Sequence, residues 1–271
     1  MRPREGGFAL VPALWVAVIL AVVVGSVLQL GRGDARLTRA REQAASREAL
    51  LDGIVTGVIQ RLRGPAATQP PVDGTPFAVT LDGLAARVAV LDEAGKFDLN
   101  QGRPDHLLLA LMAAGQEAGA AAVMAERILG WRVDGGSAEP YRAAGLAHGP
   151  RGGRFRSPAE LRMVPGMTEP LLASLAPMVT VYSQTAVIDP VFSDSRLLEA
   201  LLGGEPAAEA ALRRRRAVAL GLAEPGRGPG VVQGHAYTIM VTPEDRDAPA
   251  RTAVIRLTGR AGDPVWVYRW R

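Results

Sequence analysis

The sequence predicts an α+β fold, in which a long N-terminal helix and an antiparallel sheet are combined with an all-helical insertion domain. Three observations predict it. Apolar residues recur at helical spacing over most of residues 8–63, and runs that alternate like strands occur both early and late in the chain. Between these runs, residues 104–180 are rich in alanine and leucine at helical spacing. Strands on both sides of a helical block are explained most simply if the block is inserted into one sheet domain.

The composition restricts the chemistry available to the chain. Its 271 residues contain no cysteine, which excludes disulfides, thiolate metal sites and a catalytic thiol. Its three histidines are isolated, and no metalloprotease, nucleophile-elbow or Walker lysine motif is present. The net charge of +4 is compatible with an anionic membrane surface or a nucleic acid but requires neither. We therefore predict that the protein is not an enzyme.

A long apolar run lies close to the N-terminus. The segment from Phe8 to Leu28 carries no charge, and its roughly 20 residues are enough to span a bilayer as a helix. A secretory signal peptide has a shorter apolar core that ends in a small-x-small cleavage site, and no convincing site of that kind follows this run. We therefore predict a retained transmembrane helix over residues 8–30. Arginines on both sides leave its orientation open.

The helical pattern continues beyond the apolar run. Apolar residues recur at helical spacing from Leu37 to Leu62, and Gly64-Pro65 then ends the helix. Two interpretations fit: a membrane anchor with a short stalk, or one continuous helix of about 55 residues that lies half in lipid and half on a folded head. We expect residues 31–63 to pack on the head.

The head is predicted in two parts, residues 64–103 and 181–271, on either side of the helical insertion 104–180. Both parts contain strand-like runs. These runs are FAVTL (77–81), ARVAVLDE (86–93), AYTIMVT (236–242), TAVIRLT (252–258) and PVWVYRW (264–270). Within the insertion, Ser157-Pro158-x-Glu160 combines an N-cap, an early proline and an early acid, which is typical of a helix start.

The N-terminus resembles the signal of type IV pilins and pseudopilins, in which a short basic leader ends in glycine before a phenylalanine and an apolar helix. The resemblance implies that a prepilin peptidase removes residues 1–7 by cutting between Gly7 and Phe8, that the mature N-terminus is methylated, and that the apolar helix stays on the protein. The fifth mature position is usually glutamate in this class, whereas Pro12 stands here. This departure is typical of one member, the minor pseudopilin K of type II secretion.

Three further motifs extend the resemblance to the minor pseudopilin K family (general secretion pathway protein K) over most of the chain. They are GKFDLNQ (95–101), WRVDGGSAEPY (131–141) and FRSPAELRMVPGM (155–167), and TVYS (180–183) follows them. None is specific alone, but their order behind a pilin-type leader is specific. One departure is clear: where the family usually has an Asn-x-Asn-Thr-Ala run, this chain has VIDPVFSDSRLLEAL.

The resemblance implies a pilin-like fold and a structural role. A minor pseudopilin of this kind is a single-pass protein of the bacterial inner membrane with its C-terminal head in the periplasm. It would initiate and cap the tip of the pseudopilus that exports folded proteins. The implied partners are the I-type and J-type minor pseudopilins, the major pseudopilin and the prepilin peptidase, with no nucleic acid among them.

The resemblance also implies a calcium ion, because members of this family bind calcium in the head. Calcium takes six or more oxygen ligands. The matching loop offers Asp134 and Glu139, but the usual acidic run is thinned to DGG. Two interpretations stay open: a calcium site completed by backbone carbonyls, or an ordinary polar loop.

The alternative function is that of a membrane-tethered DNA-binding protein of the competence-receptor kind. The stretch ELRMVPGMTEPLLASL (160–175) resembles a helix-hairpin-helix, whose turn offers backbone N–H groups to a phosphate. Glu169 would repel a phosphate, and Pro170 has no N–H to offer. We therefore favour a structural hairpin. The run of four arginines at 213–216 is likewise interpreted as a solvated helix rather than a nucleic-acid or lipid patch.

Overall fold

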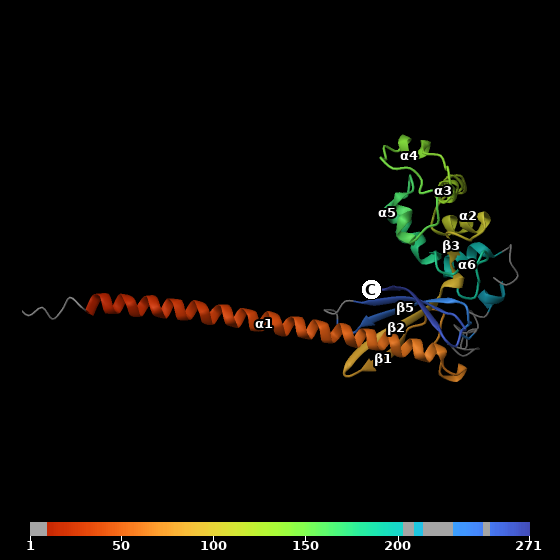
Figure 1. Ribbon diagram of the computed structural model, residues 1–271. Coiled ribbons are helices and arrows are strands. Elements are labelled where there is room, and N and C mark those ends of the chain that lie inside the picture. The colour runs from red at the N-terminus through yellow and green to blue at the C-terminus, as the bar shows by residue number, and fades with distance from the viewer. Residues whose placement is uncertain (1–9, 203–208, 214–229, 246–249) are drawn as a thin grey trace, which may run out of the picture. The chain divides into compact units, whose positions relative to one another are not determined.

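The computed structural model describes residues 10–202, 209–213, 230–245 and 250–271, and it leaves out the side chains of residues 10–11 and 24–40. The chain divides into two compact units, Met1–Asp52 and Gly53–Arg271. Helix α1 (Leu10–Arg63) supplies the described part of the first unit and the beginning of the second (Figure 1). The predicted leader, with Gly7 and Phe8, lies outside the described residues, as does most of the arginine run.

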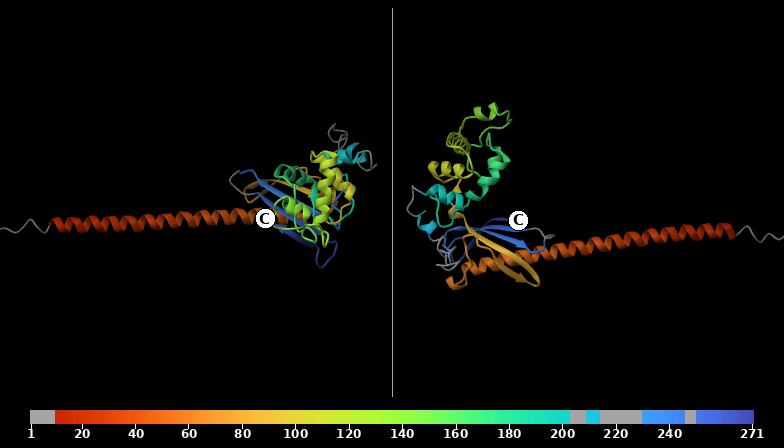
Figure 2. Two further views of the ribbon diagram at one scale, coloured as in Figure 1. Left: turned by 90° about the horizontal axis from the view of Figure 1, so that it is seen from above. Right: turned by 180° about the vertical axis from the view of Figure 1, so that it is seen from behind.

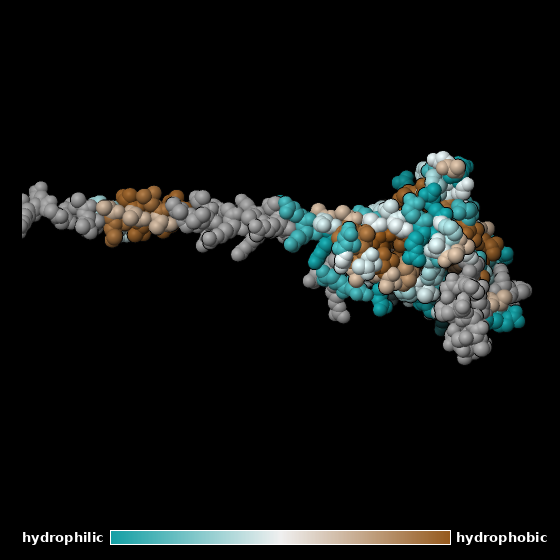
Figure 3. Space-filling view, turned by 90° about the horizontal axis from the view of Figure 1, so that it is seen from below, coloured by the Kyte–Doolittle hydropathy of each residue, from teal (hydrophilic) through white to brown (hydrophobic). Residues whose placement is uncertain are grey.

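The first unit contains an apolar stretch of α1. The described side chains from Pro12 to Val23 are all exposed and most are large and hydrophobic, which Figure 3 shows as a brown band. Among the residues whose side chains are described, no helix has the length and apolar character that a membrane span requires. The transmembrane helix over residues 8–30 stays a prediction.

The second unit contains a five-stranded antiparallel sheet, which confirms the predicted combination of helices with an antiparallel sheet. The strand order is β1-β2-β5-β6-β7. The central pairing joins β2 to β5, with Val88 opposite Val241, so segments from both sides of the helical block form one sheet. The strands are β1 (Phe77–Leu81), β2 (Leu84–Asp92), β5 (Ala236–Pro243), β6 (Arg251–Leu257) and β7 (Val265–Trp270), close to the five predicted runs.

One face of this sheet is apolar and lies against the end of α1. On β2, Ala86 and Val88 are buried while Arg87, between them in the sequence, is exposed, as the two-residue period of a strand requires. On α1, Val55, Val58 and Leu62 are buried too. The guanidinium of Arg61 lies 5.1 Å from the centre of the Phe77 ring on β1, within range of a cation–π contact.

The helical block follows β3 (Phe97–Asp98) and has its own apolar core (Figures 1 and 2). It begins with α2 (Pro104–Ala113) and α3 (Ala118–Trp131), and shorter helices follow. These are α4 (Glu139–Ala143), α5 (Glu169–Leu175) and α6 (Ser195–Leu201). Three 3₁₀ turns lie at Glu93–Gly95, Pro158–Met163 and Ala176–Met178, and another lies before the sheet at Ala66–Thr68.

Helix α6 belongs to this core although it lies beyond residue 180. Its Leu197, Leu198 and Leu201 are buried in the same cluster as Leu107 and Leu111 of α2. The core of the block therefore extends past the segment 104–180 that helical periodicity indicates.

The predicted helix start at Ser157 is a 3₁₀ turn. The Ser157 hydroxyl accepts a hydrogen bond from the Ala159 N–H at 3.2 Å, as an N-cap does.

Candidate functional site

The most elaborate polar site in the described residues is the joint between the sheet and the helical block. The joint consists of residues 92–98, where the chain leaves β2, residues 180–184, where it leaves β4 (Val179–Thr180), and residues 234–238 with Arg256 on the sheet. Its three carboxylates, Asp92, Glu93 and Asp98, are at most 2% exposed. A buried carboxylate is costly unless it is paired or hydrogen-bonded, so its partners show what it does.

Asp92 fastens the end of β2 to the start of β5. One carboxylate oxygen, Oδ1, accepts a hydrogen bond from the Ala94 N–H at 2.9 Å and caps the short 3₁₀ turn. The other, Oδ2, lies 2.8 Å from Nδ1 of His235. This hydrogen bond, aided by the negative charges of Asp92 and Asp189, raises the pKa of His235, and burial of the ring opposes it. The imidazolium form therefore holds the two strands more strongly than the neutral form.

Glu93 connects the block to the sheet directly. Its Oε1 accepts hydrogen bonds from Lys96 Nζ at 2.5 Å and from the Thr238 hydroxyl on β5 at 2.6 Å. Its Oε2 accepts a hydrogen bond from the hydroxyl of Thr180, in the second strand of the small sheet, β4 (Val179–Thr180). One buried side chain thus binds groups from three segments of the chain.

Asp98 connects the segment that follows β3 with the segment that follows β4. Its Oδ1 accepts hydrogen bonds from the N–H groups of Asn100 and Gln101 at 2.8 and 3.0 Å. Its Oδ2 accepts from the Gln184 N–H at 2.8 Å and the Ser183 hydroxyl at 3.1 Å. Strands β3 and β4 pair in parallel beside it, with Asp98 opposite Thr180.

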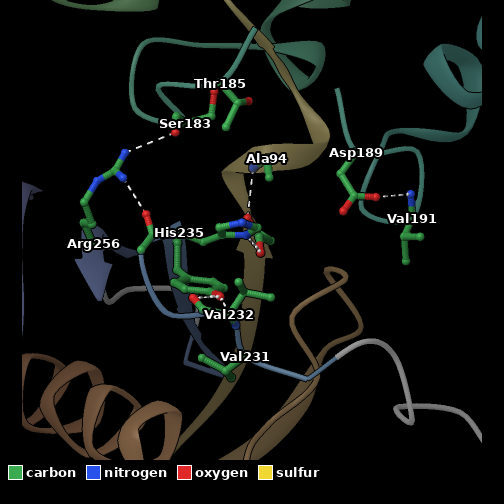
Figure 4. Close-up of polar contacts among 12 residues, drawn as sticks. Ala94, Ser183, Thr185, Asp189, Val191, Val231, Val232, His235 and Arg256 are labelled. Atoms are coloured by element: carbon green, nitrogen blue, oxygen red, sulfur yellow. Dashed lines mark hydrogen bonds and ion pairs between the residues drawn. The ribbon is translucent and has the colours of Figure 1, made fainter. Parts of the chain in front are cut away.

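Arg256 on β6 holds the outgoing segment from the sheet side (Figure 4). Its Nη2 donates to the carbonyl oxygens of Tyr182 at 2.6 Å and Ser183 at 3.1 Å, and its Nη1 donates to that of Gly234 at 2.5 Å. Its Nε donates to the Tyr268 hydroxyl at 2.8 Å. A planar guanidinium suits this role, because its donors are fixed in one fork.

Gly95 shows how closely the segments approach at the joint. A Cβ atom at this position would lie 2.3 Å from the carbonyl carbon of Phe192, far inside van der Waals contact. The amide of Asp189, in the same segment as Phe192, donates to the Ala94 carbonyl at 2.8 Å. The glycine is therefore needed for close backbone packing at this point.

The carboxylates of the joint hold segments of the chain together. All six oxygens of the three carboxylates accept hydrogen bonds from the protein itself. The sequence motifs did not mark Asp92, Glu93 or His235, and the only signal was a cluster of acids, DEAGKFD, directly after a strand. That cluster indicates buried charge but not its partners.

The three motifs of the block meet at one place. The amide of Asn100, from the first motif, accepts a hydrogen bond from the Phe155 N–H at 2.7 Å and donates to the Phe155 carbonyl at 3.0 Å. The ring of Phe155, from the third motif, stacks on Trp131 of the second motif, with ring centres 5.9 Å apart. Trp131 also packs against Tyr141 at 6.1 Å. These motif residues form the interior of the block.

The predicted site residues lie elsewhere. Asp134 follows α3 and Glu139 begins α4, and both are exposed. Within the part of the chain that the structure describes, no group of three or more His, Cys, Asp or Glu side chains is placed to hold a metal ion. Calcium at this loop would therefore need backbone carbonyls, and it stays a prediction. Pro12 lies near the beginning of the described part of α1, and its side chain is exposed.

The hairpin at 160–175 is used within the protein. The Met167 N–H donates to the Val164 carbonyl at 3.1 Å, and Arg127 of α3 donates from Nη1 to the Pro165 carbonyl at 3.1 Å. Glu169 is exposed at the start of α5 and pairs with Arg162 at 2.8 Å. A carboxylate thus stands where a phosphate would have to approach.

A sheet packed on the end of a long helix, with a helical block joined to it through buried carboxylates, defines an α+β fold with a helical domain added to the sheet. Residues 91–184 match the family model described as type II secretion system (T2SS), protein K. This segment includes residues 92–98 and 180–184 of the joint and all three motifs, and over it the chain is similar to the protein K family of type II secretion, in agreement with the sequence resemblance.

The fold has a counterpart among solved structures. The chain is similar to a chain in the crystal structure of the GspK-GspI-GspJ complex from the type 2 secretion system of enterotoxigenic Escherichia coli, with 16% sequence identity and a TM-score of 0.55. The similarity covers 88% of this chain and 98% of that one. No curated protein sequence matches the chain. At this identity the likeness concerns the fold.

Proposed function

We propose that this protein is a minor pseudopilin of a type II secretion system that initiates and caps the tip of the periplasmic pseudopilus. The observation that carries the proposal is the protein K match over residues 91–184, whose motifs form the interior of the inserted block and its joint. The role is structural and not enzymatic. The head would act through its shape and its contacts during the export of folded proteins.

The inserted block supports a position at the end of the filament. The block adds a second apolar core to a head that already has the sheet and the end of α1. Neighbouring subunits pack around every subunit within a shaft, whereas a terminal subunit has one free side. A subunit enlarged by a block of this size is therefore accommodated more easily at a tip.

Pro12 supports the same position. In pilin-like filaments the carboxylate at the fifth mature position is thought to pair with the N-terminal ammonium of the subunit ahead. A terminal subunit has no subunit ahead, so this carboxylate would be buried without a partner, which is costly in a low-dielectric core. An uncharged residue at position 12 avoids that cost.

The proposal includes processing and membrane insertion. A prepilin peptidase would cut between Gly7 and Phe8, the new N-terminus would be methylated, and residues 8–30 would lie in the inner membrane with the head in the periplasm. Replacing Gly7 with glutamate should leave uncut precursor in the membrane, because a bulky charged side chain cannot be tolerated beside the extended backbone that is cut. N-terminal sequencing should show that the mature protein begins at Phe8, and a mature protein that begins at Met1 or beyond Gly25 would contradict the proposal.

The proposed partners are the I-type and J-type minor pseudopilins and the major pseudopilin. The similar solved chain comes from a complex of GspK with GspI and GspJ, which supports this choice. Quantitative blotting of sheared filaments tests it, since a tip subunit should occur about once per filament and label only one end. Amounts near those of the major pseudopilin, or labels along the shaft, would rule out the tip role.

A further inference from the structure

Strand β7 forms one edge of the five-stranded sheet. Among the described strands it pairs with β6 alone. An edge strand presents unpaired backbone groups and can template the addition of another strand. Whether β7 can do so depends on where its backbone groups, side chains and charges point.

The register shows which backbone groups of β7 face outward. The Thr258 N–H donates to the Pro264 carbonyl at 3.0 Å, and the Leu257 N–H donates to His235 on the other side of β6. In an antiparallel pair, hydrogen-bonded positions alternate with positions that are not hydrogen-bonded. Val265 opposite Leu257 and Val267 opposite Ile255 are therefore not bonded to β6. Both residues direct their N–H and C=O groups away from the sheet.

The side chains of this edge are apolar and large. Trp266 is 56% exposed and Val267 is 48% exposed, on opposite faces of the strand. Next to Trp266 lies an open cavity of about 510 Å³, lined also by Gln184, Arg260 and Tyr268. A strand added to β7 would place every second side chain on the face of Trp266, at the mouth of this cavity.

Basic side chains outnumber acidic ones along this edge. Arg260, Arg269 and Arg271 lie on or beside β7, and Asp263 is the acid in the hairpin that precedes it. Two copies of β7 paired with each other would bring these arginines together, and like charges placed opposite each other destabilise a strand pair. An acidic strand would instead be complementary to the edge.

We propose that β7 is a docking edge for an extended acidic segment of a partner protein, which adds to the sheet as a further strand. Its backbone would pair with Val265 and Val267, and an acidic side chain on the Trp266 face would reach Arg260 at the cavity. This inference goes beyond the proposed function and does not depend on it.

Fluorescence anisotropy with the full chain in detergent micelles tests the proposal. The probe is a labelled eight-residue peptide of alternating glutamate and valine, and the matched probe replaces glutamate with lysine. The acidic peptide should bind, and the basic peptide should bind at least about tenfold more weakly. Arg260→Glu should weaken binding of the acidic peptide by a similar factor. Equal binding of both peptides, or binding of neither, would overturn the proposal.

Proline on the edge separates strand addition from simple charge attraction. Val267→Pro removes an N–H that faces away from β6, so the sheet should keep its pairing, while peptide binding should fall at least about tenfold. The matched control is Ala78→Pro on β1, the opposite edge. The two-residue turn Asp82-Gly83 makes Leu81 and Leu84 a hydrogen-bonded pair, so Ala78 opposite Arg87 also directs its N–H outward. This control should bind like the wild type.

A second measurement covers the case in which Val267→Pro does not fold. In a strand, successive amides point to opposite edges, so a peptide that is N-methylated at every second amide loses the hydrogen bonds of one edge only. Two such peptides, methylated at the odd or at the even amides, are compared. One of them should not bind the wild type, and the other should bind. If both methylated peptides bind equally, the peptide does not add as a strand. If the protein instead self-associates in sedimentation and Val267→Pro prevents it, the edge is an interface between two copies and the acidic partner is wrong.

Discussion

Two regions of the head carry conspicuous carboxylates, and they use the same functional group in opposite ways. At the joint, Asp92, Glu93 and Asp98 are buried, and each oxygen accepts a hydrogen bond from the protein. In the loop after α3, Asp134 and Glu139 are exposed. A carboxylate withdrawn from water must be satisfied by the fold, so it fixes the positions of its partners. A carboxylate in water has no such effect on the fold and is free to bind a ligand.

The largest effect is expected at Glu93. Glu93→Ala leaves the Lys96 ammonium and the hydroxyls of Thr180 and Thr238 without their acceptor. Removing one partner of a buried ion pair destabilises a protein by about 3–5 kcal/mol. Urea unfolding of the detergent-solubilised chain measures the loss. Glu93→Gln, which keeps the shape and one acceptor oxygen, should lose less, and Glu169→Ala at the exposed pair with Arg162 should change little. A loss at Glu93 no greater than at Glu169 would remove the distinction between the two regions.

A smaller effect is expected at Asn100, where the partner is a backbone. Asn100→Ala leaves the N–H and C=O groups of Phe155 unpaired, and an unsatisfied buried polar group costs about 1–3 kcal/mol. The loss should appear in the unfolding free energy together with a weaker near-ultraviolet circular dichroism signal, since Phe155 stacks on Trp131. Asn100→Asp keeps the acceptor and loses the donor, so it should lie between the alanine variant and the wild type.

The dependence of stability on pH tests the link between Asp92 and His235. The pKa of His235 is raised above its ordinary 6.5, chiefly by the hydrogen bond to Asp92, so the folded state binds this proton more tightly than the unfolded state. The resulting stabilisation is complete below pH 6.5 and is lost as the pH rises through the folded-state pKa. Unfolding free energies measured between pH 6 and pH 8.5 should show this decline in the wild type. His235→Gln should lack it, and an identical decline in that variant would assign it to another group.

The smallest effect on folding is expected in the loop. Without calcium, Asp134→Asn and Glu139→Gln should leave the unfolding free energy nearly unchanged, because neither side chain is buried. Titration calorimetry with calcium then tests the predicted site. Heat of binding in the wild type that disappears in Asp134→Asn would establish calcium at this loop. A loss of stability in the calcium-free variants would show that these carboxylates support the fold as the joint does.

Local patterns in the sequence predict the sheet well. On β1 and β2 less exposed residues alternate with more exposed ones, as in Ala86, Arg87 and Val88, so the pattern is complete within a few residues. Helix α6 is less obvious, because SRLLEAL is short and lies in the segment that departs from the family pattern. Its assignment to the block depends on packing with α2, which helical spacing alone does not reveal.

The joint could not be predicted from the sequence, for a physical reason. Glu93 reaches Thr180, 87 residues away, and Thr238, 145 residues away. Thr180 begins the segment TVYS, but nothing in the sequence indicates that its hydroxyl, or that of Thr238, binds Glu93. The acidic residues are apparent in DEAGKFD. Whether they form a ligand site or buried hydrogen bonds within the fold depends on the positions of their hydrogen-bond donors, which the sequence does not give.

The pairing of β3 with β4 has a consequence for how this head could have arisen and how it could be altered. Because Phe97 lies opposite Val179 and Asp98 opposite Thr180, the segment between the two strands begins and ends at neighbouring points, about 4.8 Å apart between strands. A polypeptide whose two ends are adjacent can be spliced into such a position without displacing the host. The same position suits a grafted fluorescent or affinity domain in place of the segment between β3 and β4, while the chain keeps its own sheet.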